Sequence, residues 1–112
     1  MRTVTLQVSK LQDVKRRGRD AFKGSKQGSR ISFARPELLF RLLTAKRWEL
    51  TRSMAGAGPL AIREIARRVK RDKAVHADVH ALLDAGVLQR TKEGLVVFPF
   101  DAIHVDVMLH AA

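Results

Sequence analysis

The sequence of 112 residues lacks cysteine, which excludes disulfide bonds, thiolate metal sites and cysteine nucleophiles. It also lacks tyrosine and has only one tryptophan and five phenylalanines, so it offers few of the aromatic side chains on which RNA-recognition modules stack bases. No hydrophobic run is long enough for a membrane span or for the core of a signal peptide. These absences predict a cytoplasmic protein.

The motifs of common enzymes are absent as well. There is no glycine-rich phosphate loop, no G-x-S-x-G and no H-E-x-x-H. Asp101, His104 and Asp106 are close in sequence, but the polar face of a strand explains them more simply than an acid–base site does. We therefore expect neither an enzyme nor a cofactor.

Positive charge, in contrast, is abundant. The chain has 22 Lys and Arg against 11 Asp and Glu, a formal net charge of +11 at pH 7. The charge is uneven, because residues 1–35 hold ten basic and two acidic residues, and no Lys or Arg follows Lys92. A small chain this basic usually binds a polyanion, and nucleic acid is the first candidate.

Residues 1–30 form a predicted N-terminal appendage. Thr3–Val8 alternates polar and apolar residues, as a strand with one apolar face does. Ser9 then caps a predicted helix that runs to Lys23 and carries a basic face opposite an apolar one. The glycine- and serine-rich run 24–30 is typical of a linker, and it places the domain boundary there.

Residues 31–112 form the predicted main domain, which begins with two helices. Pro36 suits the first position of one helix, and Thr44 suits the N-cap of the next, Ala45–Ala55. Met54 and four aromatic side chains are expected in the core; the aromatics are Phe33, Phe40, Trp48 and Phe98.

Two further helices are predicted after Pro59, separated by a tight turn. The first has an apolar series on one face, consisting of Leu60, Ile62, Ile65, Ala66 and Val69. Asp72 is the expected N-cap of the second, Lys73–Ala85, and Gly86 is expected to end it in the left-handed conformation. Its buried stripe consists of Val75, Val79, Leu82 and Leu83. Residues 87–90 and 95–98 then form a predicted hairpin around Gly94.

This order of helix, turn, helix and hairpin is the plan of a winged helix-turn-helix, whose second helix fits the major groove of DNA. The expected fold class is α+β, mainly α, with the hairpin as the wing and with an N-terminal strand-helix appendage. The sequence therefore predicts a DNA-binding domain over residues 31–112.

The same residues carry the motifs of a known family. They read ISFARPELLFRLLTAKRWELTRSMAGAGPLAIREIARRV, then DKAVHADVHALLDAGVL and VVFPFDAIHVDVML. This pattern resembles small prokaryotic MarR-like winged helix-turn-helix DNA-binding regulators. The resemblance implies an antitoxin of a toxin–antitoxin pair, which represses its own operon and neutralises a cognate toxin.

The predicted DNA contacts lie on the two helices around the turn and on the wing. They are Arg63, Arg67, Arg68, Arg71, Lys73, His76, Ala77, His80, Arg90 and Lys92. Lys73 and His76 are suited to donate to guanine edges or phosphate, and Ala77 to touch a thymine methyl group. The alternative interpretation is that these side chains only solvate exposed helix faces.

His76 and His80 also have the i, i+4 spacing that can bind zinc. Two ligands are too few for a structural site and no thiolate can complete it, so we expect no metal. Histidines that face the DNA groove or the solvent are the favoured interpretation.

The two terminal strands, Thr3–Val8 and Ile103–Leu109, each have an apolar face. Either they pair within one subunit, or one of them builds a homodimer or receives a toxin by strand addition. The candidate partner-binding or dimerisation residues are Val4, Leu6, Val8, Leu11, Val14, Phe22, Ile103, Val105, Val107 and Leu109. A homodimer is expected independently, because groove-reading helices usually come in pairs that match palindromic half-sites.

The function that these observations predict is sequence-specific DNA binding by a transcriptional regulator. The alternative is a protein-interaction module that uses the winged helix as a scaffold and binds nucleic acid only non-specifically. RNA binding through the basic appendage is a weaker alternative, because the stacking aromatics are few.

Overall fold

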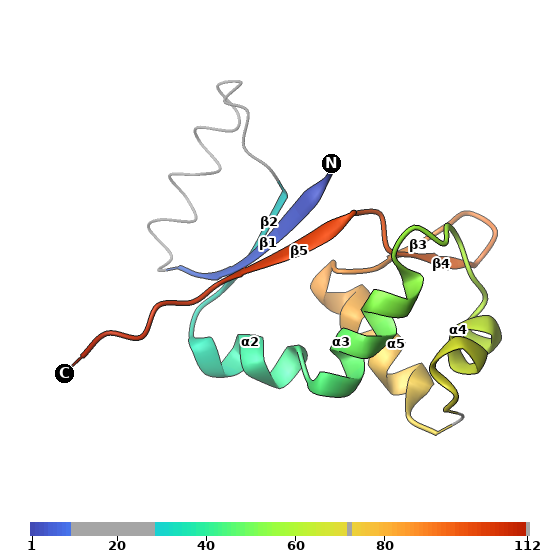
Figure 1. Ribbon diagram of the computed structural model, residues 1–112, viewed down its shortest axis with the longest axis horizontal. Coiled ribbons are helices and arrows are strands. Elements are labelled where there is room, and N and C mark those ends of the chain that lie inside the picture. The colour runs from blue at the N-terminus through green and yellow to red at the C-terminus, as the bar shows by residue number, and fades with distance from the viewer. Residues whose placement is uncertain (10–28, 72, 112) are drawn as a thin grey trace.

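In the computed structural model, residues 1–9, 29–71 and 73–111 are described, and they form a small α+β protein (Figure 1). The described elements are β1 (Thr3–Val8), β2 (Ser29–Phe33), α2 (Pro36–Leu42), α3 (Ala45–Met54), α4 (Ile62–Val69), α5 (Val75–Ala85), β3 (Gln89–Arg90), β4 (Val96–Val97) and β5 (Ala102–Asp106). The helix predicted from Ser9 to Lys23, with Leu11, Val14 and Phe22, falls almost wholly outside the described residues.

Three strands form a parallel sheet in the order β2-β1-β5. The strand predicted at Thr3–Val8 is confirmed, and as β1 it lies in the middle of the sheet with Val4 and Leu6 fully buried. Ser29 and Arg30 were expected in a linker but belong to β2, because they pair with β1. The predicted domain boundary at residue 30 therefore falls inside a strand of this sheet.

The two helices predicted after Pro36 are present. Pro36 occupies the first turn of α2, and the hydroxyl of Thr44 accepts a hydrogen bond from the backbone N–H of Arg47 at 3.2 Å, which caps α3. Met54 is fully buried, as expected. Phe40 and Trp48 were expected in the core but are 57% and 43% exposed, so that part of the prediction is wrong.

The buried face of each helix explains these two errors. On α3 the buried residues are Leu50, Thr51 and Met54, and Trp48 lies at the edge of the face that they form. On α2 the buried residue is Leu39, and Phe40 is its immediate neighbour on a different face. Apolar spacing alone could not show which leucines of α2 reach the core.

The helix predicted after Pro59 begins later than expected. Leu60 forms an isolated antiparallel bridge with Val96, with both N–H···O distances at 2.8 Å, and α4 begins only at Ile62. Leu60 therefore acts as a one-residue strand beside β4 rather than as part of the helix. At the other end of α4, Lys70 adopts the left-handed conformation with φ of 55°.

The next helix also begins later than predicted. α5 begins at Val75, and its N-cap is Ala74, in the left-handed conformation with φ of 66° and without a side-chain cap. The prediction of Asp72 as the N-cap is therefore wrong, and Asp72 itself lies outside the described residues. Lys73 therefore precedes the helix instead of opening it. The predicted end is confirmed, because Gly86 has φ of 90° and its N–H reaches the carbonyls of the last turn.

The predicted hairpin is present but short. β3 and β4 are antiparallel, and Gly94 in their turn has φ of 82°.

One hydrophobic core joins this hairpin, the helices and the sheet, and its buried members are Val4, Leu6, Leu39, Leu50, Met54, Ile65, Val75, Val79, Leu82, Val87, Leu88, Val96, Phe98 and Phe100. Over the described ranges, no helix has the length and apolar character to traverse a lipid bilayer.

Candidate nucleic-acid interface

The outward face of α5 contains the residues that the sequence analysis singled out there. His76, Ala77 and His80 are exposed, whereas Val75 and Val79 are buried, because the helix turns its apolar stripe to the core. The rings of His76 and His80 stack with their centroids 5.3 Å apart. The structure thus brings the two histidines together on an open surface.

A cleft of about 480 Å³ connects this face of α5 to α4 and the hairpin turn. Its lining consists of Ala61, Ile62, Arg63, Ala66, Val75, His76 and Gly94. Arg63 lies in the first turn of α4 and is exposed. Three segments predicted to contact DNA, the start of α4, the start of α5 and the wing, therefore meet at one hollow.

Arg71 is held differently from the other predicted contacts. Its Nη1 lies 3.2 Å from Oδ2 of Asp78, and its Nη2 donates to the carbonyl of Lys46 at 3.4 Å. The other carboxylate oxygen of Asp78, Oδ1, accepts from Nε of Arg47 at 3.0 Å. Both arginine side chains are mostly buried, so the guanidinium of Arg71 is already engaged within the protein.

We call Arg47, Arg71 and Asp78 the arginine clamp. Arg47 also donates from Nη1 to the carbonyl of Leu42 at 3.0 Å, so the clamp ties the α2–α3 junction to α5. Sequence reasoning missed Arg47 and Asp78. The available signal was an acid at position 78, inside the apolar stripe of α5, because a buried carboxylate requires a cation.

Arg67 and Arg68 are exposed and pair with Glu64 one turn earlier. The N···O distances are 2.9 Å for Arg67 and 3.8 Å for Arg68. Exposed pairs of this kind contribute little free energy, so a phosphate can replace Glu64 at low cost. On the hairpin, Arg90 donates to the carbonyl of Gly94 at 3.3 Å. Lys92 is exposed in the hairpin turn.

A second basic cleft, of about 390 Å³, lies between α3 and α4. It is lined by Ala45, Lys46, Glu49, Ser53, Arg68, Val69, Lys70 and Arg71. Sequence reasoning missed Lys46 and Lys70, although residues 45–73 contain nine Lys and Arg against three Asp and Glu. α5 itself contains no Lys or Arg, and Asp84 lies exposed on it. The positive charge is therefore on α3, α4 and the turn, beside α5 rather than on it.

The predicted partner-binding residues fall into three groups. Val4 and Leu6 are fully buried in the core of this chain, so their side chains are not available to a partner, and Val8 is half-buried. β1 and β5 pair with each other, which is the first of the two alternatives for the terminal strands. Leu11, Val14 and Phe22 lie outside the described residues. Ile103, Val105, Val107 and Leu109 range from half-buried to fully exposed.

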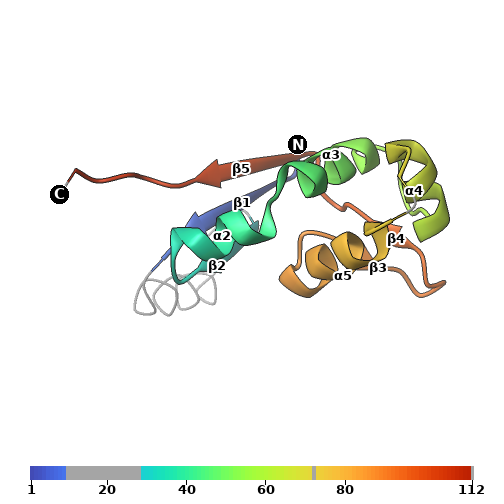
Figure 2. The same cartoon turned by 90° about the horizontal axis from the view of Figure 1, so that it is seen from below.

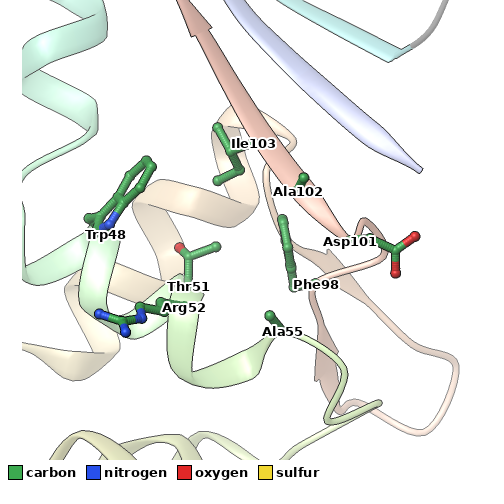
Figure 3. A pocket seen from close by; sticks show the side chains of 8 residues that line it. All are labelled: Trp48, Thr51, Arg52, Ala55, Phe98, Asp101, Ala102 and Ile103. Carbon is green, nitrogen blue, oxygen red and sulfur yellow. The ribbon is translucent and has the colours of Figure 1, made fainter. Parts of the chain in front are cut away.

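An apolar cleft of about 380 Å³ lies between α3 and β5 (Figure 3). It is lined by Trp48, Thr51, Arg52, Ala55, Phe98, Asp101, Ala102 and Ile103. Figure 3 shows Trp48 of α3 and Ile103 of β5 on opposite sides of it. We call it the tryptophan cleft; sequence reasoning missed it, because it assigned Trp48 to the core.

No cluster of three or more histidine and acidic side chains that could hold a metal occurs within residues 1–9, 29–71 and 73–111. His104, on β5, is exposed and does not join His76 and His80 in such a cluster.

The chain was compared with known protein families, curated proteins and solved structures. A family model described as HVO_A0114 matches residues 42–105, which is more than half of the chain. The matched segment runs from the end of α2 through the hairpin and into β5. No curated protein and no solved structure matches the chain.

Proposed function

We propose that this chain, which belongs to the HVO_A0114 family, is a sequence-specific DNA-binding protein of the winged helix-turn-helix type. The order of its elements supports this assignment. α3 is followed by the bridging Leu60, then α4, α5 and the hairpin β3–β4, and Leu60 pairs with β4. Three helices with a small antiparallel sheet in this order are the plan of a winged helix.

The observation that carries the proposal is the cleft shared by Arg63, His76 and Gly94. It places a cation of α4, the exposed face of α5 and the tip of the hairpin on one side of the molecule. Arg67 and Arg68 are exposed on the same helix as Arg63. A surface of this kind suits a duplex, whose groove receives a helix while its phosphates meet the flanking cations.

Each group has a distinct role in the proposed complex. α5 enters the major groove, where Lys73 and His76 donate to base edges. Arg63 and Lys70 bind phosphates on either side of it, and Arg90 on the wing binds the backbone next to the groove. Because α5 has no Lys or Arg of its own, most of the affinity comes from these flanking contacts.

The arginine clamp has a positioning role in this proposal. Asp78 lies on α5 and its two cations come from α3 and from the turn. The clamp therefore fixes the angle of α5 relative to α3, and Arg71 acts on DNA through α5 rather than through phosphate.

The biological role in the proposal is that of a cytoplasmic transcriptional regulator which binds its operator as a homodimer. Two copies present two α5 helices to half-sites about one turn of DNA apart. The MarR-like and antitoxin roles remain predictions of the sequence resemblance. They are tested by asking whether the product of a neighbouring gene binds the protein and changes its affinity for DNA.

A protein-interaction module is the second candidate, and the tryptophan cleft is the observation that favours it. The cleft has a half-exposed tryptophan and lies away from the cations of α4. In that case the winged helix is a scaffold and nucleic-acid binding is non-specific.

Fluorescence anisotropy across a salt series distinguishes the two candidates. One duplex is the DNA upstream of the gene and the other is a scrambled sequence of the same length. A preference of about a hundredfold or more at physiological salt supports sequence-specific recognition. Equal affinities that fall together with salt would reject it and leave only non-specific attraction.

Matched variants locate the interface in the same assay. Arg63→Ala and Lys73→Ala remove cations from the proposed surface, whereas Arg41→Ala removes an exposed cation of α2 outside it. The three variants have the same net charge. Weaker binding by the first two, with Arg41→Ala close to the wild type, supports the assignment, and an equal loss in all three contradicts it.

A further inference from the structure

β5 is an edge strand whose outer side has backbone groups free to pair with another strand. It pairs with β1 on one side, and no other strand of the described residues pairs with it. The N–H of Ala102 donates to the carbonyl of Arg2 at 3.3 Å, toward β1. Because backbone groups alternate sides along a strand, Ile103 and Val105 direct their N–H and C=O groups to the open edge. β5 has none of the lysines or prolines that usually protect such an edge.

Most residues that follow β5 are apolar, and those beyond Val107, which packs against the core, project from the molecule. Figures 1 and 2 show residues 107–111 continuing past the sheet, away from α4, α5 and the hairpin. Met108 is 71% exposed and Leu109 is 96% exposed, and Val105 within the strand is 36% exposed. Exposed apolar side chains that continue an open strand are typical of an association site.

We propose that two copies of this chain associate through antiparallel pairing of their β5 strands about a twofold axis at Val105. The segment reads I-H-V-D-V over residues 103–107 and is complementary to itself in this register. Val105 meets Val105 of the second copy, Ile103 meets Val107, and His104 meets Asp106. Apolar residues therefore face apolar residues, and each histidine faces a carboxylate.

The distribution of charge along the chain favours association of a second copy at the open edge of β5. The net charge is +11, so two copies repel each other wherever their cations meet. No Lys or Arg follows Lys92, and β5 has Asp106 as its charged residue. The edge itself is therefore poor in cations, and Arg52 is the one cation in the lining of the adjacent cleft, so two such basic chains can approach here with little repulsion.

The tryptophan cleft lies where the proposed register brings the tail of the second copy. Figure 3 shows the cleft on the side of β5 that faces away from β1. Leu109 of the second copy lies opposite Asp101, on the face that bears Ile103, because paired residues of antiparallel strands share a face. Both Asp101 and Ile103 line the cleft. Leu109 thus lies at the Asp101 end of the cleft, across from Trp48, and the same contact occurs twice.

Cysteine crosslinking tests the register without DNA, so its outcome is independent of the proposed function. The chain has no cysteine, and Val105→Cys introduces a single thiol at the axis. A directly opposed hydrogen-bonded pair has its Cα atoms about 5.5 Å apart, within the reach of a disulfide. Met108→Cys is the matched control, because the register separates its two copies by about 20 Å.

Mild oxidation is expected to convert the Val105→Cys variant to a covalent dimer and to leave the Met108→Cys variant monomeric. Equal crosslinking of both variants, or none in either, would overturn the proposed pairing. Circular dichroism of the reduced proteins verifies that both variants are folded.

Dilution of the protein without cysteines tests the contact with the cleft. Trp48 is the only tryptophan, so its emission reports the environment of the cleft and is expected to shift to longer wavelength as the dimer dissociates. Leu109→Ser is expected to raise the dissociation constant about a hundredfold, because it exposes two leucine side chains, one in each copy, and each contributes about tenfold. Met108→Ser, on the opposite face, is expected to change it less. A wild-type chain that light scattering shows to be monomeric at high protein concentration would refute the proposal.

Discussion

The helices and hairpin of residues 45–98 differ from the parallel sheet in what they expose. The first region carries eleven of the Lys and Arg residues of the chain, and those of α4 are all exposed. The sheet buries its central strand and exposes apolar side chains at and beyond β5, where Lys and Arg are absent. The two regions thus differ in surface charge, and this difference fits the two proposals above, a polyanion as the partner of the first region and a second copy of the chain as the partner of the sheet.

The two regions nevertheless share one core. Leu6 of β1 and Leu82 of α5 belong to the same buried cluster, and β1 packs against α2. The difference between the regions is therefore one of surface, and we expect them to fold together.

The largest expected effect comes from breaking the shared core. Leu6→Ala is expected to lower the free energy of unfolding by about 3–5 kcal/mol, because Leu6 is fully buried. Urea unfolding followed by circular dichroism and by Trp48 emission is expected to give coincident transitions. Separate transitions for the two probes would mean that the sheet and the helices unfold independently.

The arginine clamp gives the next largest effect, and it is confined to the helical region. Asp78→Ala leaves two mostly buried guanidinium groups without their carboxylate and is expected to cost about 3 kcal/mol. Asp84→Ala removes an exposed acid from the same helix and is the control, with an expected change within about 0.5 kcal/mol. Chemical denaturation measures both. Equal losses would show that the clamp contributes no more than surface charge does.

A smaller effect is expected at the end of α5. Gly86 has φ of 90°, and a methyl group there would lie 3.8 Å from Ile31, so space is available and the backbone alone opposes alanine. Gly86→Ala is expected to lower the midpoint of thermal unfolding, with a cost of about 1–2 kcal/mol. An unchanged midpoint would indicate that the helix ends in another conformation.

The smallest effect on stability is expected from an arginine whose role is at the surface. Arg67→Ala breaks an exposed pair with Glu64 and is expected to change the free energy of unfolding by less than about 0.5 kcal/mol. If Arg67 binds phosphate, the same substitution reduces the slope of log affinity for DNA against log salt by about 0.9. Arg71→Ala is the informative comparison, because the clamp predicts the reverse: a clear loss of stability and an unchanged slope. A reduced slope in Arg71→Ala would show that Arg71 leaves the clamp to bind DNA.

Several local elements were predictable from a side-chain period or a cap, although the cap predicted at Asp72 and the helical period assigned to Leu60 were wrong. Three features show this: the alternating strand Thr3–Val8, the N-cap Thr44 and the left-handed Gly86. In each case the residue types favour the backbone conformation that is observed. The division of α5 into a buried and an exposed face followed from the spacing of Val75, Val79 and Leu82 for the same reason.

Features made by distant residues were not predictable in this way. The Leu60–Val96 bridge involves a single residue and has no period, so Leu60 was assigned to the following helix. The sequence shows an acid at position 78, but it does not reveal that one of its cations comes from Arg47, 31 residues earlier. Trp48 was assigned to the core on residue type, whereas its exposure depends on where β5 lies relative to α3.

The central position of β1 determines when the parallel sheet can form during synthesis of the chain. Thr3 pairs with Ala102, so one edge of the innermost strand stays open until almost the whole described chain has been synthesised. Closing such a long loop is slow compared with forming helices, which need only local contacts. During that interval one edge of β1 and its apolar face remain uncovered on the growing chain, and an unpaired strand edge is a site at which chains can associate.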